Sequence, residues 1–287
     1  MKNIRIKSYC KINLYLKVVK KLNDGYHNIS SLITFCRLHD IISISKSRNS
    51  KDNVSFSGKF KTGIHKEKNT ITKVLNLLRK ENLIKNQTFK INIKKNIPHG
   101  SGLGSGSSNA ASLLNFLNIK MRLKLDSKKI VKIARKVGFD VPINLKKRNT
   151  LLIGQKEKLL RLNHKFKLNL LIVYPNLICS TKKIYKINKK ISSIKLSPIY
   201  KIQNNKKLIK FLKYEKNDLQ EAVIKIYPKI KKIINYIKLQ KGCYFSRITG
   251  SGSACIGIFS NMRNAIYAKR LIKRKYPKYW CAVSKTI

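Results

Sequence analysis

Residues 98–112, PHGSGLGSGSSNAAS, place four of the 13 glycines in the chain within seven positions. The stretch before them, TFKINIK, alternates apolar and polar side chains and predicts a half-buried strand. Leu113, Leu114 and Leu117 after them have the spacing of one helix face. Glycine lets the backbone approach a ligand closely, and the first N–H groups of a helix have no partner within that helix. A strand, a glycine loop and a helix N-terminus in this order therefore predict a phosphate-binding loop.

Two common nucleotide-binding loops do not match this stretch. A Walker loop requires a lysine directly after its last glycine, and no lysine lies between Gly100 and Asn109. A dinucleotide-binding loop requires the spacing GxGxxG and a later acidic residue, whereas these glycines alternate with single residues and Asp126 has the setting of a helix N-cap. A polar loop without a ligand remains the alternative to phosphate binding. We expect Ser107 or Ser108 to cap the helix that follows.

The formal net charge of +54 comes from 65 basic and 11 acidic residues. A charge of this size is typical of nucleic-acid-binding proteins. Here the lysines are spread through every segment together with isoleucine and asparagine, and these three residues share A/T-rich codons. The even spread favours a biased composition over a binding arm or patch, so we expect no dedicated nucleic-acid partner.

Length and composition predict a globular protein with a substantial core. No apolar run approaches the roughly 18–20 residues that span a bilayer, and the N-terminus has no secretory signal. The expected location is therefore the cytoplasm, without a membrane partner. The six cysteines form no CxxC pair and are expected to be reduced and mostly buried. The sequence does not indicate an oligomeric state.

Hydrophobic periodicity predicts helices and strands throughout the chain. One helix is expected from Asn69, with Ile71, Val74, Leu75 and Leu78 inward, and another after Asp126, with Ile130, Val131, Ala134 and Val137 inward. Further expected elements are a turn at residues 23–27, strands around 41–44 and ending at Pro175, helices near 204–214, 218–240 and 262–275, a strand pair around 249–259, and a final strand at 279–285. We place a domain boundary in the polar stretch near 155–165, between residues 158 and 159. Helices and antiparallel strands in this order predict two α+β domains.

Two charged residues stand in apolar surroundings. Asp140 lies in GFDVPI, where a partly desolvated carboxylate is a candidate general base, although a capping or turn aspartate explains the same pattern. Lys11 interrupts the apolar strand SYCKINLYL, which is costly unless the lysine faces a cleft or an anion. Since the chain has 65 basic residues, this lysine alone carries little information.

The glycine loop resembles the phosphate-binding motif PxGxGLGSSxA of the GHMP kinases. KINLYLKV, DGYHNI, NTITKVLNLL, GFDVPI, NDLQEAVIKIYPKI and SRITGSGSACIGIF resemble further motifs of one group in this family, in the same order along nearly the whole chain. Several motifs in the correct order are far more specific than any one of them. The resemblance implies an α+β, two-domain GHMP kinase fold. It has an N-terminal ATP-binding domain at residues 1–158, a C-terminal ferredoxin-like substrate domain at 159–287, and the active site in the cleft between them.

That group phosphorylates the 2-hydroxyl of 4-diphosphocytidyl-2-C-methyl-D-erythritol with ATP and Mg²⁺, in the non-mevalonate pathway of isoprenoid precursor biosynthesis. The resemblance implies that Lys11 and Asp140 form the catalytic pair, with Asp140 accepting the hydroxyl proton. The implied ATP-binding residues are Asn69, Lys95, Pro98, His99, Gly100, Ser101, Gly102, Leu103, Gly104, Ser105, Gly106, Ser107, Ser108 and Asn109. The implied substrate-binding residues are Asn13, Tyr26, His27, Thr181, Tyr185, Gly250, Ser251 and Gly252. Tyr26 and Tyr185 would sandwich the cytosine ring, and Ser107 is a candidate magnesium ligand.

The chain departs from the family pattern at several positions. Ser101 and Ser105 stand where the family has glycine or alanine, Phe139 replaces a small residue, and Asn144 replaces an aromatic one. A positive φ at either serine would cost about 1 kcal/mol. None of these changes removes a proposed chemical group, so we expect retained activity with reduced stability. The alternatives are a GHMP kinase for a smaller alcohol such as homoserine and a basic nucleic-acid-binding protein.

Overall fold

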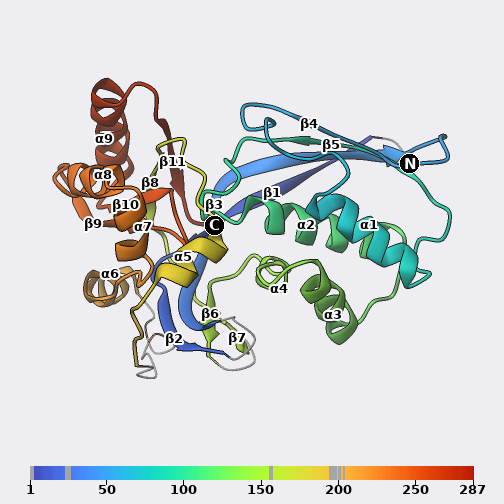
Figure 1. Ribbon diagram of the computed structural model, residues 1–287, viewed down its shortest axis with the longest axis horizontal. Helices are drawn as coiled ribbons and strands as arrows, with labels where there is room; N and C mark the ends of the chain where they lie inside the picture. Colours follow the sequence, from blue (N-terminus) through green and yellow to red (C-terminus); the bar gives the residue numbers. More distant parts are fainter. Residues whose placement is uncertain (1–2, 23–26, 155–157, 194–198, 200–201, 203) are drawn as a thin grey trace. The chain divides into compact units, whose positions relative to one another are not determined.

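The computed structural model describes residues 3–22, 27–154, 158–193, 199, 202 and 204–287 (Figure 1). The chain forms two compact units. The first unit consists of Met1–Cys10, Leu38–His99 and Gly104–Lys147, and the second of Lys11–Arg37, Gly100–Leu103 and Arg148–Ile287. The predicted boundary between residues 158 and 159 falls inside the second unit, and as a boundary between family domains it stays a prediction. The turn expected at residues 23–27 lies largely outside the described residues.

The first unit contains a mixed sheet with helices on one face (Figure 1). Strand β5 (Phe89–Lys94) pairs in parallel with β4 (Asn53–Ser57) and antiparallel with the C-terminal part of β3 (His27–Lys46). Strand β1 (Ile4–Asn13) also pairs with β3. The helices are α1 (Thr70–Lys80), α2 (Ser105–Lys120), α3 (Ser127–Val137) and α4 (Val141–Asn144). Ile91 of β5, Leu75 of α1 and Leu114 of α2 belong to one buried apolar cluster, which is the core of this unit.

Most of the elements expected in this unit are confirmed. Phe89, Ile91 and Ile93 are buried on one face of β5, as their alternation predicts. The four apolar residues expected to face inward from α1 are all buried. Asp126 caps α3 by accepting a hydrogen bond from the Lys129 N–H. The inward face of α3 differs from the expectation, because the buried positions are Ile133, Ala134 and Val137, whereas Ile130 and Val131 are only partly buried.

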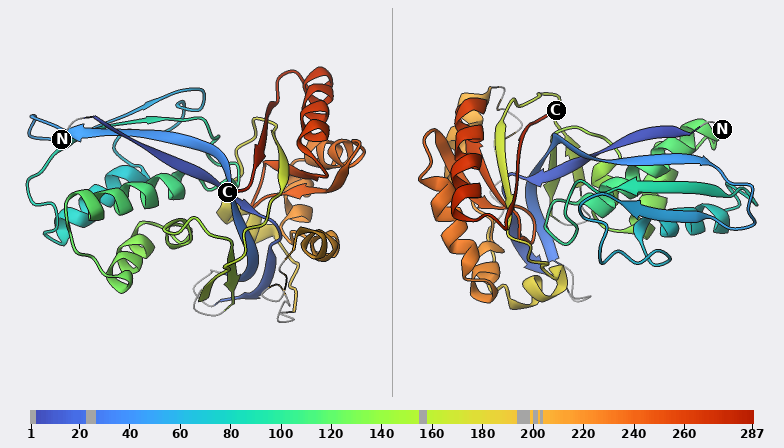
Figure 2. Two further views of the ribbon diagram at one scale, coloured as in Figure 1. Left: turned by 180° about the vertical axis from the view of Figure 1, so that it is seen from behind. Right: turned by 90° about the horizontal axis from the view of Figure 1, so that it is seen from above.

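A four-stranded antiparallel sheet forms the centre of the second unit. Its strands are β8 (Asn169–Tyr174), β9 (Cys243–Ile248), β10 (Cys255–Phe259) and β11 (Trp280–Lys285), in the order β11-β8-β10-β9. Numbered along the chain, this order is 4-1-3-2, with helices before β9 and after β10, which is the ferredoxin-like arrangement. Helices α8 (Lys229–Lys238) and α9 (Met262–Lys275) pack on one face of the sheet (Figure 2). The expected strands and the helix at 262–275 are confirmed.

The predicted helix at 218–240 is wrong, because the structure contains two helices there. Helix α7 (Gln220–Ile226) ends before Pro228, and α8 begins after it. Tyr227 has φ −128° and ψ 78°, outside the helical region. A proline disfavours the helical conformation of the residue before it, so the chain turns at this point although the apolar spacing continues.

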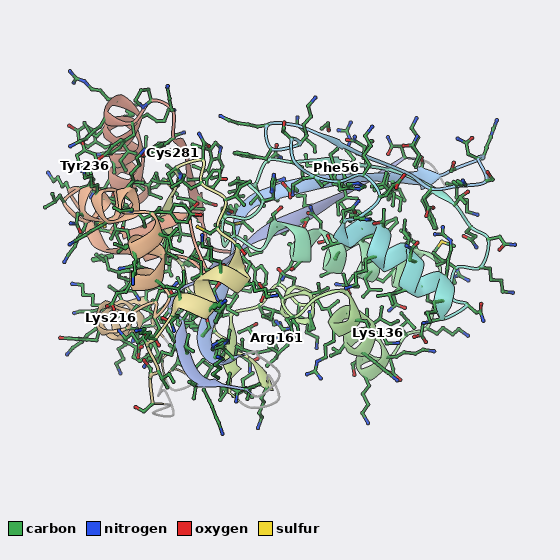
Figure 3. The ribbon with its side chains drawn as sticks, viewed as in Figure 1. Phe56, Lys136, Arg161, Lys216, Tyr236 and Cys281 are labelled. Atoms are coloured by element: carbon green, nitrogen blue, oxygen red, sulfur yellow. The ribbon has the colours of Figure 1, made fainter. Side chains whose placement is uncertain are left out.

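The remaining strands of the second unit build on the N-terminal part of β3. Strand β2 (Lys17–Lys21) and strand β6 (Thr150–Ile153) both pair antiparallel with it, and β7 (Lys158–Arg161) pairs with β6. Arg161, labelled in Figure 3, donates from Nη1 to Thr150 Oγ1 at 2.7 Å across the β6–β7 pair. Burial lowers the pKa of Arg161 to about 10. Helices α5 (Thr181–Ile187) and α6 (Asn205–Tyr214) complete the unit.

The six cysteines are free thiols, and five of them are buried, as the sequence predicts. Burial raises the pKa of Cys179 to about 11 and that of Cys243 to about 12. These thiols are therefore protonated and unreactive near neutral pH. In the described part of the chain, no helix is both long and apolar enough to cross a membrane.

Candidate active site

The glycine loop lies between β5 and α2, and its backbone is unusual. Gly100, Gly102 and Gly104 have φ values of 61°, 81° and 67°, in the left-handed region that glycine tolerates best. Helix α2 begins at Ser105, and Gly104 occupies its N-cap position without a side-chain cap. The prediction that Ser107 or Ser108 caps this helix is therefore wrong. A glycine at the N-cap leaves the first N–H groups of α2 available to an anion.

Ser108 makes hydrogen bonds within the first unit and does not cap α2. Ser108 lies inside the first turns of α2, donates from Oγ to the Tyr9 carbonyl at 2.6 Å, and accepts from Ser8 Oγ at 3.0 Å. These bonds attach α2 to β1 within the first unit. Ser101 and Ser105 are buried, and neither has a positive φ, so the strain considered for them does not arise. Ser107 is half-buried in the first turn of α2.

Residues 100–103 belong to the second unit, where backbone groups hold them. The Cys179 N–H donates to the Gly100 carbonyl at 3.0 Å, and the Ala254 N–H donates to the Ser101 carbonyl at 2.9 Å. Gly102 lies so close to Thr249 that a Cβ atom on Gly102 would be 2.1 Å from the Thr249 carbonyl oxygen. Only glycine fits at position 102, so the close approach fixes the path of the loop.

Lys11 and Asn13 stand together at the end of β1 in the second unit. They are 4% and 2% exposed, and Lys11 Nζ donates to Asn13 Oδ1 at 3.0 Å. The Lys11 N–H also donates to the Leu103 carbonyl at 3.2 Å, which brings the lysine to the glycine loop. Asn13 in turn donates from its backbone N–H to Thr249 Oγ1 at 2.9 Å and from Nδ2 to Ser31 Oγ at 2.8 Å. The structure thus gathers two of the predicted site residues beside the loop.

The segment 249–254 contacts Asn13 and the glycine loop in the second unit. Gly250 and Gly252 have φ values of 56° and 77°. Asn217 Nδ2 donates to the Gly250 carbonyl at 2.8 Å and to the Ile248 carbonyl at 3.2 Å. The hydroxyls of Thr181 and Ser251 are 2.9 Å apart and share a hydrogen bond. Thr181, Ser251 and Asn13, all predicted substrate-binding residues, are therefore connected to one glycine-rich segment.

Sequence reasoning assigned no function to Thr249 or Asn217, although both organise this site. Thr249 is completely buried and Asn217 is 4% exposed. Each lies inside a stretch that had been recognised as a motif, SRITGSGSACIGIF and NDLQEAVIKIYPKI. A polar residue within such a motif was the available signal, but the bonds that connect these two residues to Asn13, Ile248 and Gly250 span 31 or more residues of the chain.

His27 and Tyr185 form the part of the site expected to bind a base. Their ring centroids are 4.9 Å apart, and the rings are tilted by 36°. Burial lowers the pKa of His27 below 6.5, and the nearby Lys21 lowers it further, so the imidazole is neutral at physiological pH. Tyr26, the other ring predicted to stack on the base, lies outside the described residues.

Asp140 lies in the first unit, directly before the short helix α4. It occupies the N-cap position of α4 within a turn, although its side chain makes no capping hydrogen bond, so a turn aspartate remains the alternative to a general base. Asn144 Nδ2 donates to the Asp140 carbonyl at 2.6 Å, and Phe139 is 53% exposed. Because Lys11 belongs to the second unit, its pairing with Asp140 stays a prediction.

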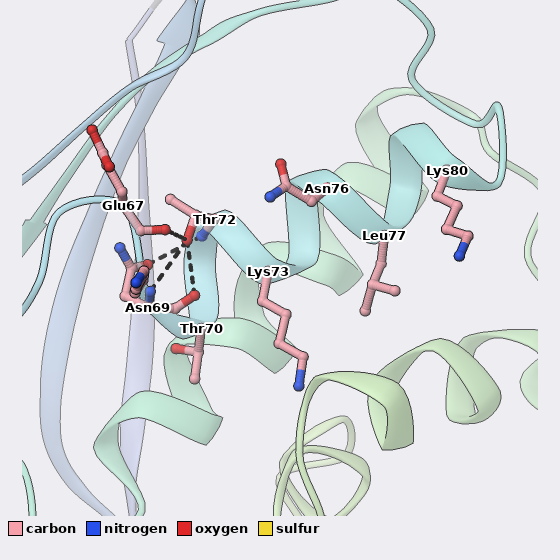
Figure 4. Close-up of a pocket in the computed structure, with 9 residues that line it drawn as sticks. Glu67, Asn69, Thr70, Thr72, Lys73, Asn76, Leu77 and Lys80 are labelled. Atoms are coloured by element: carbon pink, nitrogen blue, oxygen red, sulfur yellow. Dashed lines mark hydrogen bonds between the residues drawn. The ribbon is translucent and has the colours of Figure 1, made fainter.

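Asn69, predicted on the nucleotide side, is the N-cap of α1. Its Oδ1 accepts from the Ile71 and Thr72 N–H groups, and Thr72 Oγ1 accepts from the Asn69 N–H, which completes a capping box. A pocket of ≈ 540 Å³ runs along α1 from this cap, and Figure 4 shows Asn69, Thr70 and Thr72 grouped at its N-terminal end. Thr70 Oγ1 donates to the Gly106 carbonyl at 2.9 Å, which connects the cap to the first turn of α2.

Lys95 and His99 flank the loop on its strand side. Lys95 is 2% exposed, and its ammonium group contacts Asp40 and Ser105 inside the first unit. His99 Nε2 lies 2.9 Å from the Thr62 carbonyl, and Pro98 is buried. Asp40 could not be identified from the sequence, because nothing in the alternating strand around it distinguishes it from a surface carboxylate. Among the described residues, no group of three or more His, Cys, Asp or Glu side chains could hold a metal ion.

Known proteins resemble the chain over its whole length. The description "GHMP kinases N terminal domain" matches residues 69–146, and "GHMP kinases C terminal" matches residues 201–278. The 4-diphosphocytidyl-2-C-methyl-D-erythritol kinase of Pelagibacter ubique is 37% identical across 289 aligned positions, which cover 100% of both chains. The enzyme of the same name from Caldanaerobacter subterraneus is 34% identical over 99% of this chain and 97% of its own.

Solved structures agree on the fold. A crystal structure of 4-(cytidine 5'-diphospho)-2C-methyl-D-erythritol kinase superposes with a TM-score of 0.77 at 23% identity, over 99% of this chain and all of the other. A homoserine kinase from Cytophaga hutchinsonii gives a TM-score of 0.74 at 16% identity, over 100% of this chain and 95% of its own. The predicted α+β, two-domain fold is confirmed. The chain belongs to the GHMP kinases, a family of ATP-dependent phosphotransferases, and within it to the group of 4-diphosphocytidyl-2-C-methyl-D-erythritol kinases.

Proposed function

We propose that this chain transfers the γ-phosphoryl group of ATP to the 2-hydroxyl of 4-diphosphocytidyl-2-C-methyl-D-erythritol, giving the 2-phosphate and ADP. The observation that carries the proposal is the site in the second unit, where Lys11, Asn13 and Thr249 are connected by hydrogen bonds beside residues 100–103 of the glycine loop. A buried lysine and a glycine-rich backbone are suited to a substrate pair that carries many negative charges.

The glycine loop would hold the ATP phosphates through its backbone. Gly104 at the N-cap leaves the N–H groups of the first turn of α2 available, and the dipole of the helix adds a partial positive charge there. Lys11 would stabilise the negative charge on the transferring phosphoryl group. Phosphoryl transfer depends mainly on positioning and charge stabilisation, so these groups account for most of the chemistry.

Asp140 would act as the general base. The proton of the 2-hydroxyl passes to its carboxylate, the hydroxyl oxygen forms a bond to the γ-phosphorus, and the bond to the bridging oxygen breaks as ADP leaves.

Recognition of the cytidine would depend on His27 and Tyr185, together with Tyr26. A neutral imidazole can donate one hydrogen bond and accept another, which suits the edge of a cytosine ring. Tyr185 offers an aromatic face for stacking. Asn13, Thr181 and the segment Gly250-Ser251-Gly252 would contact the erythritol or diphosphate part of the substrate.

Mg²⁺ is the expected companion of ATP. The ion takes oxygen ligands and usually binds phosphates together with one or two protein groups, and when bound it neutralises charge on the transferring phosphoryl group. The hydroxyl of Ser107, half-buried in the first turn of α2, fits this requirement. A cytoplasmic location and the lack of a dedicated nucleic-acid partner stay predictions from the sequence.

The test is ADP release by the purified protein with Mg-ATP, using either the diphosphocytidyl substrate or homoserine as the acceptor. We expect turnover only with the diphosphocytidyl substrate. Asp140→Asn should lower kcat by about 10²–10⁴, while Asp126→Asn, which removes a carboxylate from the same unit but keeps a capping side chain at the start of α3, should leave kcat near the wild-type value. Turnover on homoserine alone would exclude the proposed substrate, and salt-sensitive RNA binding without turnover would exclude the kinase activity.

A further inference from the structure

Asp40 is a completely buried carboxylate in the C-terminal part of β3. Five donors converge on its two oxygens. Oδ1 accepts from the Asn96 N–H at 2.7 Å and from the Ile97 N–H at 2.9 Å. Oδ2 accepts from Ser105 Oγ at 2.8 Å, from Asn109 Nδ2 at 3.2 Å and from the Lys95 ammonium group. This is an unusual concentration of bonds for one of only 11 acidic residues in the chain.

The two oxygens serve opposite ends of the glycine loop. Asn96 and Ile97 lead into the loop from β5, and Ser105 and Asn109 lie in the first turns of α2, where the loop ends. Asp40 therefore fixes both ends of residues 98–104 from a third, separate strand. Lys95 contacts the carboxylate and Ser105 together, so it adds a second connection between the strand end and the helix start.

Stability alone is a weak explanation for this cluster. Burial lowers the pKa of Lys95, and the adjacent Asp40 carboxylate offsets part of that shift. Desolvating both charges is costly, and apolar side chains of similar volume commonly stabilise a core equally well or better. An apolar core cannot hold two backbone N–H groups and three side-chain donors at fixed positions around one side chain, as the Asp40 carboxylate does.

We propose that Asp40 is a positioning residue for ATP: it holds both ends of the phosphate-binding loop, so that the loop amides are arranged for the triphosphate before it binds. The proposal rests on the proposed function only in that the glycine loop binds ATP. Lys95, expected from the sequence to bind the nucleotide, acts in this arrangement through Asp40 and Ser105. Preorganisation of this kind lowers the cost of ordering the loop at the moment of binding.

The experiment compares three variants with the wild-type protein: Asp40→Asn, Lys95→Met and the double variant Asp40→Asn/Lys95→Met. Asp40→Asn keeps the shape of the side chain but places an amide where three donors point, and it leaves Lys95 as a buried charge without its carboxylate. The double variant removes both charges, so it should recover thermal stability that the single variants lose. Each protein is examined by thermal unfolding, by titration with a non-hydrolysable ATP analogue, and by steady-state kinetics in both substrates.

A positioning function predicts that nucleotide affinity and stability respond differently. We expect Asp40→Asn and the double variant to weaken the affinity for the ATP analogue and to raise the KM for ATP by about tenfold or more, while the KM for the acceptor alcohol changes little. The loss of affinity should persist in the double variant after its stability recovers. If nucleotide affinity returned together with stability in the double variant, Asp40 would be a structural residue and the proposal would be overturned.

Asp52→Asn is the matched control within the same unit. Asp52 also pairs with a cation, Arg79, at 2.7 and 2.9 Å, and accepts from the Phe89 N–H at 2.9 Å, but it has no bond to the glycine loop. We expect this variant to lose stability and to keep the wild-type affinity for the ATP analogue. Equal losses of affinity in Asp52→Asn and Asp40→Asn would also overturn the proposal. The titration needs no acceptor, so a wild-type protein that binds the analogue without phosphorylating the acceptor would refute the proposed substrate and leave this test valid.

Discussion

The two units hold the glycine loop by different physical means. In the first unit, its two ends are attached to the Asp40 carboxylate by side-chain and backbone donors. In the second unit, residues 100–103 are held by backbone hydrogen bonds to residues 179 and 254 and by the close approach of Gly102 to Thr249. The first attachment depends on a charge, and the second depends on the absence of a side chain.

The difference determines how each attachment can fail. A charged cluster can lose one bond and retain the others, so its failure should appear as a graded loss of nucleotide affinity. A backbone contact at van der Waals distance has no room for an added atom, because the neighbouring carbonyl cannot move without breaking its own hydrogen bonds. Substitutions in the second unit should therefore have larger effects than substitutions at the ends of the loop.

Gly102→Ala should have the largest effect. The added Cβ would lie 2.1 Å from the Thr249 carbonyl oxygen, and the residue has φ 81°, so both overlap and backbone strain oppose it. We expect the free energy of unfolding to fall by about 3 kcal/mol or more and kcat/KM to fall with it. Denaturant unfolding followed by circular dichroism measures the first quantity, and the ADP-release assay measures the second.

Gly106→Ala is the matched control for stability. Gly106 lies in the first turn of α2 without a positive φ, and an added Cβ would meet only Thr70, at 3.7 Å. Because alanine favours a helix more than glycine does, its free energy of unfolding should be unchanged or higher by up to about 1 kcal/mol. Similar destabilisation by both substitutions would contradict the distinction between the two parts of the loop.

Asn217→Ala should have the next largest effect. The substitution removes the amide that donates to the Ile248 and Gly250 carbonyls and accepts from the Leu219 N–H, all in a buried environment. Leaving these groups without partners should lower the free energy of unfolding by roughly 3 kcal/mol. Asn115→Ala, which removes one partly buried bond to the Leu145 carbonyl in the first unit, should lower it by about 1 kcal/mol. An equal loss of unfolding free energy in the two variants would show that the segment 249–254 does not depend specially on Asn217.

Thr249→Val, in the segment 249–254, should have a smaller effect than Asn217→Ala. Valine keeps the shape of threonine but cannot accept the hydrogen bond from the buried Asn13 N–H. We expect the free energy of unfolding to fall by about 1–2 kcal/mol and kcat to fall more than the KM for ATP rises, since Asn13 contacts Lys11. Thr88→Val, which removes an exposed bond to the Asn49 carbonyl and a long contact of 3.5 Å to the Ser47 carbonyl, is the control and should change the unfolding free energy by less than about 0.5 kcal/mol. Thermal unfolding and steady-state kinetics on both variants provide the comparison.

The sequence predicted the features that depend on neighbouring residues. Alternation identified β5, helical spacing identified α1 and α9, and Asp126 was recognised as a cap because its partner is three residues away. The start of α2 was placed wrongly because serine is a common N-cap, whereas here the left-handed Gly104 takes that position. The helix at 218–240 was predicted as continuous because its apolar spacing continues across Pro228.

The sequence predicted the site residues that the family resemblance assigns, and it did not predict the buried residues that hold them in place. Lys11, Asn13, Thr181 and the segment 250–252 were named from the resemblance to the GHMP kinases, and the structure connects Lys11 to Asn13, Asn13 to Thr249, and Thr181 to Ser251 by hydrogen bonds. Asp40 and Asn217 were not assigned a function because, apart from the Leu219 N–H beside Asn217, their partners lie 31 or more residues away and depend on how the strands pair. Local patterns carry no information about which buried donor meets which acceptor across a sheet, so such residues become visible only in the folded chain.

The smallest effect is expected at His27, a neutral group, in contrast to the charged groups that hold the glycine loop in the first unit. The prediction concerns how the unfolding free energy changes with pH. Burial and Lys21 hold the pKa of His27 below its unfolded value of 6.5, so the fold favours the neutral imidazole. The stabilising contribution of His27 is therefore present above pH 6.5 and is lost as the pH falls below 6.5 towards the folded pKa.

We expect the wild-type protein to lose more unfolding free energy than His27→Gln between pH 7.5 and 5.5. Lys21→Gln should move the folded pKa of His27, measured by NMR titration, back towards 6.5. A His27 pKa above 6.5 in the wild-type protein would reverse the sign of the pH dependence and would remove the argument for a neutral ring at the cytosine edge.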